Sequence, residues 1–153
     1  MSLSDHFTLV ELTKSQTAER LGIDNTPSDE VIGNLASMCD SVLEPIRAHY
    51  GVPFSPSSAY RSEALNKAIG GSPTSAHCHG LAVDIELPRS AGVSNPDLAR
   101  WVKDNLVYDQ IILEFWTGKP GSGWVHIGDN IDEPRGQVLT YTRGKGYMNG
   151  LPA

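Results

Sequence analysis

Apolar residues recur at helical spacing in the first half of the chain. They lie three or four positions apart and form one stripe: Val31, Leu35, Met38, Val42, Ile46 and Tyr50. Such a stripe predicts an amphipathic helix. The preceding Thr26-Pro27-Ser28-Asp29 has a capping residue, a proline and an acid in the order typical of a helix start. We expect the helix to begin there, to kink at Pro45 and to end at Gly51.

Two further helices are predicted. One follows Asn95-Pro96-Asp97, because Leu98, Trp101, Val102 and Leu106 then share one face. A shorter helix is expected over residues 62–69, where Gly70-Gly71 closes it.

Five segments rich in β-branched and aromatic residues are strand candidates: 54–60, 81–87, 108–115, 123–128 and 136–142. Short strands separated from the helices indicate an α+β fold, with a mostly antiparallel sheet flanked by helices. We expect a single domain over residues 1–153. Its core should cover about 7–142, and the Gly-rich residues 143–153 should form a surface tail.

Strand side chains alternate between two faces of a sheet, which predicts a polar face opposite the core. The expected core face comprises Val83, Ile85, Leu87, Ile111, Leu113, Phe115, Val125 and Ile127. The opposite face then holds Asp84, Glu86, Gln110, Ile112, Glu114, Trp124 and His126. Three strands of one sheet would therefore bring Asp84, Glu114 and His126 together.

Composition narrows the class of protein. The 153 residues are 39% hydrophobic and 20% charged, as in one globular domain with a core. The net charge of −6 argues against general nucleic-acid binding, and no apolar run is long enough for a membrane span. Cys39 and Cys78 have no metal-site spacing, so two free thiols are expected.

The polar face has the residue types of a catalytic zinc site, which takes three N or O ligands from the protein. His77 and Asp84 would supply two of them if a turn at Gly80 folds His77 back beside its strand, and His126 would supply the third. His79 is the alternative to His77. A carboxylate that is not a ligand must then move the proton of the attacking water.

Glu114 is the preferred base because it lies on the site face of the strand before His126, with Asp109 and Glu86 as alternatives. The guanidinium group of Arg61 is a candidate donor to a substrate carbonyl or carboxylate.

These residues resemble the zinc peptidases of the M15 family, the D-alanyl-D-alanine carboxypeptidase and L-alanyl-D-glutamate endopeptidase group. Residues 75–84, SAHCHGLAVD, match the family signature S-x-H-x-x-G-x-A-x-D. Residues 59–80 and the pair 108–115 and 123–128 are also similar to family segments, and 7–142 as a whole is compatible with the compact phage and prophage branch.

The resemblance implies a fold like that of the hedgehog and D,D-peptidase proteins, with one Zn²⁺ per chain on one sheet face. His77, Asp84 and His126 would be the ligands, Glu114 the general base and acid, and Arg61 the group that polarises the scissile carbonyl. Ser75, Tyr60 and Gln110 would line the substrate cleft, and Trp124 is expected to join them.

One position departs from the family pattern. Many relatives carry the catalytic acid three positions before the last histidine, where this chain has Gly123. The base must then come from elsewhere, which is compatible with Glu114. Residues 116–123, WTGKPGSG, are expected to form a flexible loop that could close over the cleft.

We therefore expect a monomeric zinc peptidase that cleaves an amide bond in the peptide stem of peptidoglycan, with no nucleic-acid or membrane partner. The N-terminus lacks the pattern of a signal peptide. Synthesis in the cytoplasm, followed by action on the cell wall as a phage lysin or virion-associated enzyme, is the expected setting. The alternatives are a zinc-bearing structural or wall-binding module without turnover, and a metal-free interaction domain.

Overall fold

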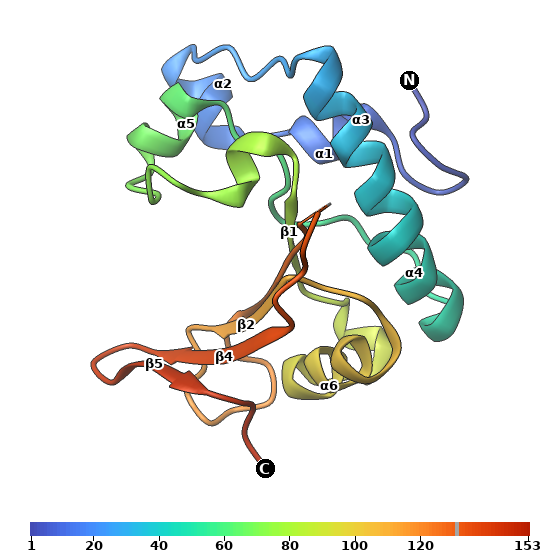
Figure 1. The fold of residues 1–153 in the computed structure, drawn as a ribbon, viewed down its shortest axis with the longest axis vertical. Coiled ribbons are helices and arrows are strands. Elements are labelled where there is room, and N and C mark those ends of the chain that lie inside the picture. The colour runs from blue at the N-terminus through green and yellow to red at the C-terminus, as the bar shows by residue number, and fades with distance from the viewer. Residues whose placement is uncertain (131) are drawn as a thin grey trace.

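The computed structural model describes residues 1–130 and 132–153 and shows an α+β protein, which confirms the predicted fold class. The helices of the first half gather at one end of the molecule and along one side, whereas the C-terminal strands lie at the other end (Figure 1). The sheet has the strand order β1-β3-β2-β4-β5. All neighbouring strands run antiparallel except β2 and β4, which are parallel.

The N-terminal half is mainly helical. Its helices are α1 (Leu9–Thr13), α2 (Gln16–Leu21), α3 (Asp29–Met38), the π-helical turn η1 (Cys39–Leu43), α4 (Glu44–Tyr50), α5 (Glu63–Ala68) and the 3₁₀ turn η2 (Ala76–His79). The second half contains β1 (Ala82–Ile85), the 3₁₀ turn η3 (Arg89–Ala91), α6 (Asn95–Asn105), β2 (Gln110–Glu114), β3 (Trp124–Gly128), β4 (Gln137–Thr142) and β5 (Gly146–Asn149).

The predicted long helix exists as α3, η1 and α4 in succession. Its N-cap is Ser28, whose hydroxyl accepts from the amide of Val31, so the predicted start at Thr26 was two residues early. The π-helical turn lies just before Pro45, where the missing amide hydrogen would break a regular α-helical bond. Gly51 ends the helix in the left-handed conformation, as predicted.

The other two predicted helices correspond to α5 and α6, which Ser62 and Ser94 cap by accepting backbone amide hydrogens. The core lies between one sheet face and the helices α3, α4 and α6. Val83, Ile85, Ile111, Leu113, Val125 and Ile127 are all buried in it, as the alternation predicted. Among the described residues, no helix is long and apolar enough to cross a membrane.

Three predictions of extended structure were wrong. Residues 54–60 make only an isolated bridge, Ser58 to Asp84, and no strand. The expected tail contains β5, which pairs with β4 because the Gly-rich turn between them allows a tight hairpin. Phe115 leaves the core face, because its φ of 53° is left-handed and ends the alternation of β2.

Candidate metal centre and cleft

His77 is the second residue of the short turn η2. The Ser75 hydroxyl accepts from the His77 amide at 3.2 Å, and Gly80 ends the turn with a left-handed φ of 70°. The imidazole Nδ1 lies 2.6 Å from the carbonyl oxygen of Ala59 and donates its hydrogen to it. With Nδ1 engaged in this way, Nε2 is the nitrogen that faces Asp84 Oδ1, at 3.2 Å; it donates to the carboxylate when the ring is protonated and is open to a metal when the ring is neutral.

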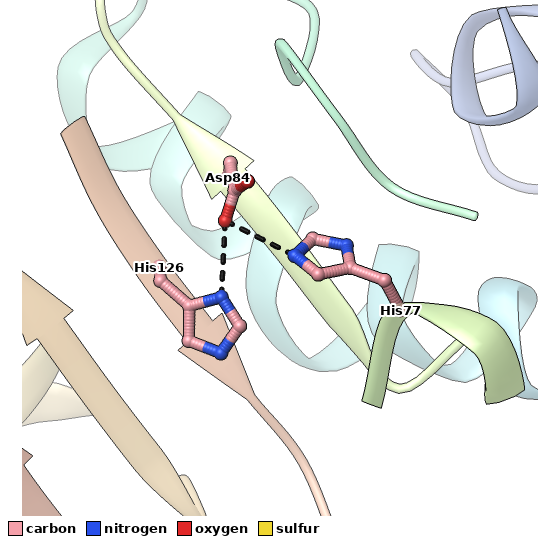
Figure 2. A group of neighbouring side chains, drawn as sticks. All are labelled: His77, Asp84 and His126. Atoms are coloured by element: carbon pink, nitrogen blue, oxygen red, sulfur yellow. Dashed lines mark hydrogen bonds and ion pairs between the residues drawn. The ribbon is translucent and has the colours of Figure 1, made fainter. Parts of the chain in front are cut away.

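Asp84 and His126 are direct partners across the antiparallel strands β1 and β3, so their side chains lie on the same face. Asp84 Oδ1 is 3.0 Å from His126 Nδ1. Figure 2 shows the carboxylate between the two imidazoles, which come from η2 and β3. All three residues are buried.

The electrostatics of Asp84 favour its charged form. Burial alone would raise the pKa of this carboxyl group, but hydrogen bonds from His126 and His77, with their charges, hold the pKa below its ordinary range. A buried carboxylate between two imidazoles is costly unless it is paired or bound to a metal. The cluster therefore keeps an anion ready to bind a cation.

The three residues fit a zinc ion in both chemistry and spacing. One donor atom from each, two imidazole nitrogens and a carboxylate oxygen, lie within 4.8 Å of one another. Zinc binds such N and O donors at about 2.0–2.2 Å, so a central ion could contact all three after small side-chain movements. His79 is exposed on the surface and is not part of the cluster.

Glu114 lies beside the cluster without joining it. Its Oε1 is 3.8 Å from His126 Nδ1. Burial, and then the negative charge of Asp84, raise the pKa of Glu114 against the opposing influence of His126. Of the two alternative bases, Asp109 is paired with Arg135 at 2.8 Å, and Glu86 is exposed.

Position 123 cannot carry the acid found there in many relatives. Gly123 has a left-handed φ of 69°, and a Cβ atom at this position would overlap the carbonyl oxygen of Glu114. Any side chain would therefore collide with the backbone of β2. The departure from the family pattern at this position has a steric cause in this fold.

A cleft of about 580 Å³ runs over the cluster. Arg61, Ser75, Gln110, Glu114 and Trp124 line it, together with the three residues of the cluster. Tyr60 does not, although it was expected to: it lies in a neighbouring hollow with residues of α2. Its location corrects that expectation.

Two residues that line the cleft each have a buried donor atom without a hydrogen-bond partner among the described residues: Arg61 at Nε and Trp124 at Nε1. A terminal nitrogen of Arg61 donates to Ser75 Oγ at 3.3 Å, which directs the guanidinium along the cleft wall. The indole N–H of Trp124 lies near enough to Glu114 to favour its charged form, yet it lacks the geometry of a hydrogen bond. Unpaired buried donors are costly, so both suit a substrate acceptor.

Hydrogen bonds hold the loop 116–123 to itself and to the start of α6. Ser122 Oγ accepts from the amide of Thr117 and donates to the carbonyl of Lys119. The buried Asn95 at the start of α6 donates to the carbonyls of Ser122 and Gly123, each at 3.0 Å. None of these loop residues is among those that line the cleft.

The comparison with known proteins agrees with this geometry. A family model described as Peptidase M15 matches residues 5–127, which include the whole cluster and Glu114. The chain belongs to the peptidase M15 family. This M15 protein therefore falls among zinc peptidases that act on peptidoglycan. The search of curated proteins found no match.

The cleft residues of this M15 chain that the prediction from sequence did not identify include two aromatic ones, Phe115 and Tyr147. Phe115 was assigned to the core by alternation, and no sequence signal marks its left-handed backbone. Tyr147 was assigned to a tail, although the segment GYMN between glycines could have indicated a short hairpin strand.

Proposed function

We propose that this protein hydrolyses an amide bond in the peptide stem of peptidoglycan, with one Zn²⁺ per chain held by His77, Asp84 and His126. The observation that carries the proposal is the location of the three donor atoms, buried within 4.8 Å of one another and open to a cleft. Zinc in such a site activates a water molecule and polarises a carbonyl group.

The histidines are prepared for this role by their own contacts. The carbonyl of Ala59 fixes the His77 tautomer, so that Nε2 is the available donor. His126 presents Nδ1 to the cluster, because that atom faces both Asp84 and Glu114. Asp84 contributes the negative charge that two neutral imidazoles lack.

Glu114 is proposed to accept the proton of the attacking water and to return it to the leaving amine. The carboxylate is next to the cluster but outside it, as a group that moves protons must be. Burial and the charge of Asp84 raise the pKa of Glu114 in the metal-free protein.

Arg61 and Trp124 are proposed to bind the substrate on either side of the reacting carbonyl. Each lines the cleft and has a buried N–H without a partner among the described residues, which a substrate oxygen would satisfy after a small side-chain movement. The positive charge of Arg61 would also stabilise negative charge that develops on the carbonyl oxygen. Ser75 keeps Arg61 in position.

The test compares Glu114→Gln with Glu86→Gln, which removes an exposed carboxylate near the end of β1. Purified peptidoglycan is digested, the released ends are analysed by mass spectrometry, and bound zinc is measured by elemental analysis. We expect wild type and Glu86→Gln to release new stem-peptide ends, and chelator to abolish the release. Glu114→Gln should keep zinc and lose turnover.

The outcomes separate this proposal from a zinc-bearing module without catalysis. Such a module would bind zinc but release no ends in the wild type. Full activity in Glu114→Gln would overturn the base assignment, and stoichiometric zinc in His126→Ala would overturn the third ligand. The masses of the ends also identify the cleaved bond, D-alanyl-D-alanine or L-alanyl-D-glutamate.

A phage lysin or virion-associated enzyme is the biological setting that we propose. It is supported by the resemblance of the chain to the compact phage branch of the family. Lysis of cells to which the purified protein is added from outside would support action on the wall. Failure to attack any isolated wall would count against it.

A further inference from the structure

A row of four aromatic rings lies beside Glu114, and three of them, Phe115, Trp124 and Tyr147, line the cleft. Phe115 stacks on Trp124 with ring centroids 5.0 Å apart. Phe115 also meets Tyr141 edge-on at 4.9 Å, and Tyr141 meets Tyr147 at 4.9 Å. We call Trp124, Phe115, Tyr141 and Tyr147 the aromatic row; they come from β3, the end of β2, β4 and β5.

The sheet register explains why the rings share the face of the metal centre. Trp124 pairs with Glu114, and Tyr141 pairs with Tyr147. Ile112 pairs with Leu139, so Tyr141, two residues further along β4, lies on the same face as Glu114. The aromatic row therefore continues the polar face of the sheet away from the cluster.

Phe115 joins the row only because of its backbone. Its φ of 53° is left-handed, which is rare and strained for a bulky side chain. The conformation turns the ring from the core to the cleft, where it fills the gap between Trp124 and Tyr141. Strain of this kind persists where the surrounding structure holds it, often at binding sites.

Tyr147 is the open end of the row. Its side chain is 63% exposed and still lines the cleft, whereas Phe115, Trp124 and Tyr141 are half-buried. It is close enough to Glu114 for that carboxylate to help raise the pKa of the Tyr147 phenol, after burial as the main cause. Tyr147 also lies beyond residues 5–127, which the family model matches.

We propose that the aromatic row, through the exposed ring of Tyr147, binds a sugar of the glycan strand of peptidoglycan and so determines specificity for glycan-linked stem peptides. This inference rests on the proposed function. Stem peptides carry mainly methyl, carboxylate and amine side chains, none of which presents a flat apolar face. A pyranose ring presents such a face through its C–H groups, and the phenol of a tyrosine can also form hydrogen bonds with the hydroxyl groups of the sugar.

The test uses two substrates with the same scissile bond: a disaccharide-linked stem peptide and the free stem peptide. The variants are Tyr147→Ala, Tyr147→Phe and the control Met148→Ala. Met148 is the neighbouring residue on β5, 53% exposed, and alternation directs it to the other sheet face. Because both positions are exposed, the variants should fold.

We expect Tyr147→Ala to raise KM for the disaccharide-linked substrate about 2- to 10-fold, the range of one aromatic contact, with kcat unchanged. KM for the free peptide should stay the same. Tyr147→Phe should keep most of the preference for the disaccharide-linked substrate over the free peptide. Met148→Ala should keep all of this preference. An equal rise in KM for both substrates, or no rise for either, would overturn the inference.

A binding experiment keeps the inference separate from the proposed function. An oligosaccharide of N-acetylglucosamine is titrated into the wild type, Tyr147→Ala and Glu114→Gln, and NMR shifts report binding. We expect wild type and Glu114→Gln to bind alike and Tyr147→Ala to bind more weakly. If neither substrate is cleaved but Tyr147→Ala alone weakens sugar binding, the proposed function fails and the inference of sugar binding holds. If the wild type does not bind the sugar, the inference is overturned.

Discussion

Gly80 connects the two parts of the metal centre, and its replacement tests how tightly the fold determines their spacing. It ends η2, the turn that contains His77, and precedes the strand that carries Asp84. Gly80→Ala places a side chain at a left-handed φ of 70°. Its Cβ would lie 2.9 Å from both Cγ1 and the carbonyl oxygen of Val31, and 3.1 Å from Cγ of Leu35.

The cost has two parts. The left-handed conformation costs an alanine about 1–2 kcal/mol. The overlap with α3 adds about 1–3 kcal/mol, because the backbone oxygen of Val31 cannot move away alone. The sum of about 2–5 kcal/mol is a large share of the roughly 5–15 kcal/mol by which domains are stable.

Gly51→Ala is the matched control. Gly51 also ends a helix, with a left-handed φ of 67°, and no heavy atom of the described residues would lie within 4 Å of a Cβ atom at this position. The free energy of unfolding of this variant should fall only by the cost of the left-handed conformation, about 1–2 kcal/mol. The difference between the two variants therefore isolates the contact with α3.

Urea denaturation of zinc-free protein measures the free energy of unfolding of each variant without a contribution from metal binding. Zinc titration then measures the affinity, which should fall in Gly80→Ala because η2 must shift and move His77 relative to Asp84. Equal losses of stability in Gly80→Ala and Gly51→Ala would refute the steric argument. Unchanged zinc affinity in a destabilised Gly80→Ala would refute the coupling to the metal centre.

Three further predictions concern the rest of the molecule. In the wild type, the ion pair with Arg135 lowers the pKa of Asp109 from 3.8 and therefore stabilises the folded state above about pH 4. Arg135→Gln removes this pair, so urea denaturation should show the wild type to be more stable than the variant above that pH. The difference should vanish as the pH falls through the pKa of Asp109 in the folded protein. Ile127→Ala, at a fully buried core position, should cost about 2–5 kcal/mol, whereas an unchanged denaturation midpoint would contradict the packing. Burial raises the pKa of the Cys39 thiol to about 11, so a thiol reagent should label the half-buried Cys78 first and Cys39 only on unfolding.

Much of the fold followed from local patterns. The stripe from Val31 to Tyr50 predicted the long helix, because helical spacing and burial impose the same period on the sequence. Alternation placed Asp84 and His126 on the face opposite Val83 and Ile127, and the observed register places them directly across from each other. These features depend on neighbours along the chain or on one strand pair.

The failures occurred where contacts distant in sequence decide the conformation. The β5 strand exists because β4 offers an open edge, and Asn95 holds the loop 116–123 through carbonyl groups 27 and 28 positions later in the chain. Phe115 turns towards the cleft because its backbone is left-handed, and its ring then lies between Trp124 and Tyr141. No local pattern contains this information.

The sequence by itself determined the fold class, the family resemblance and the residues that the polar sheet face could present. The tertiary structure decided which of them meet. It selected His77 over His79, placed Tyr60 outside the cleft, excluded a side chain at position 123 and added Tyr147. The physical reason is that residue type and period determine which side a residue faces, whereas its distance from another residue depends on strand register, turn geometry and packing of the whole chain.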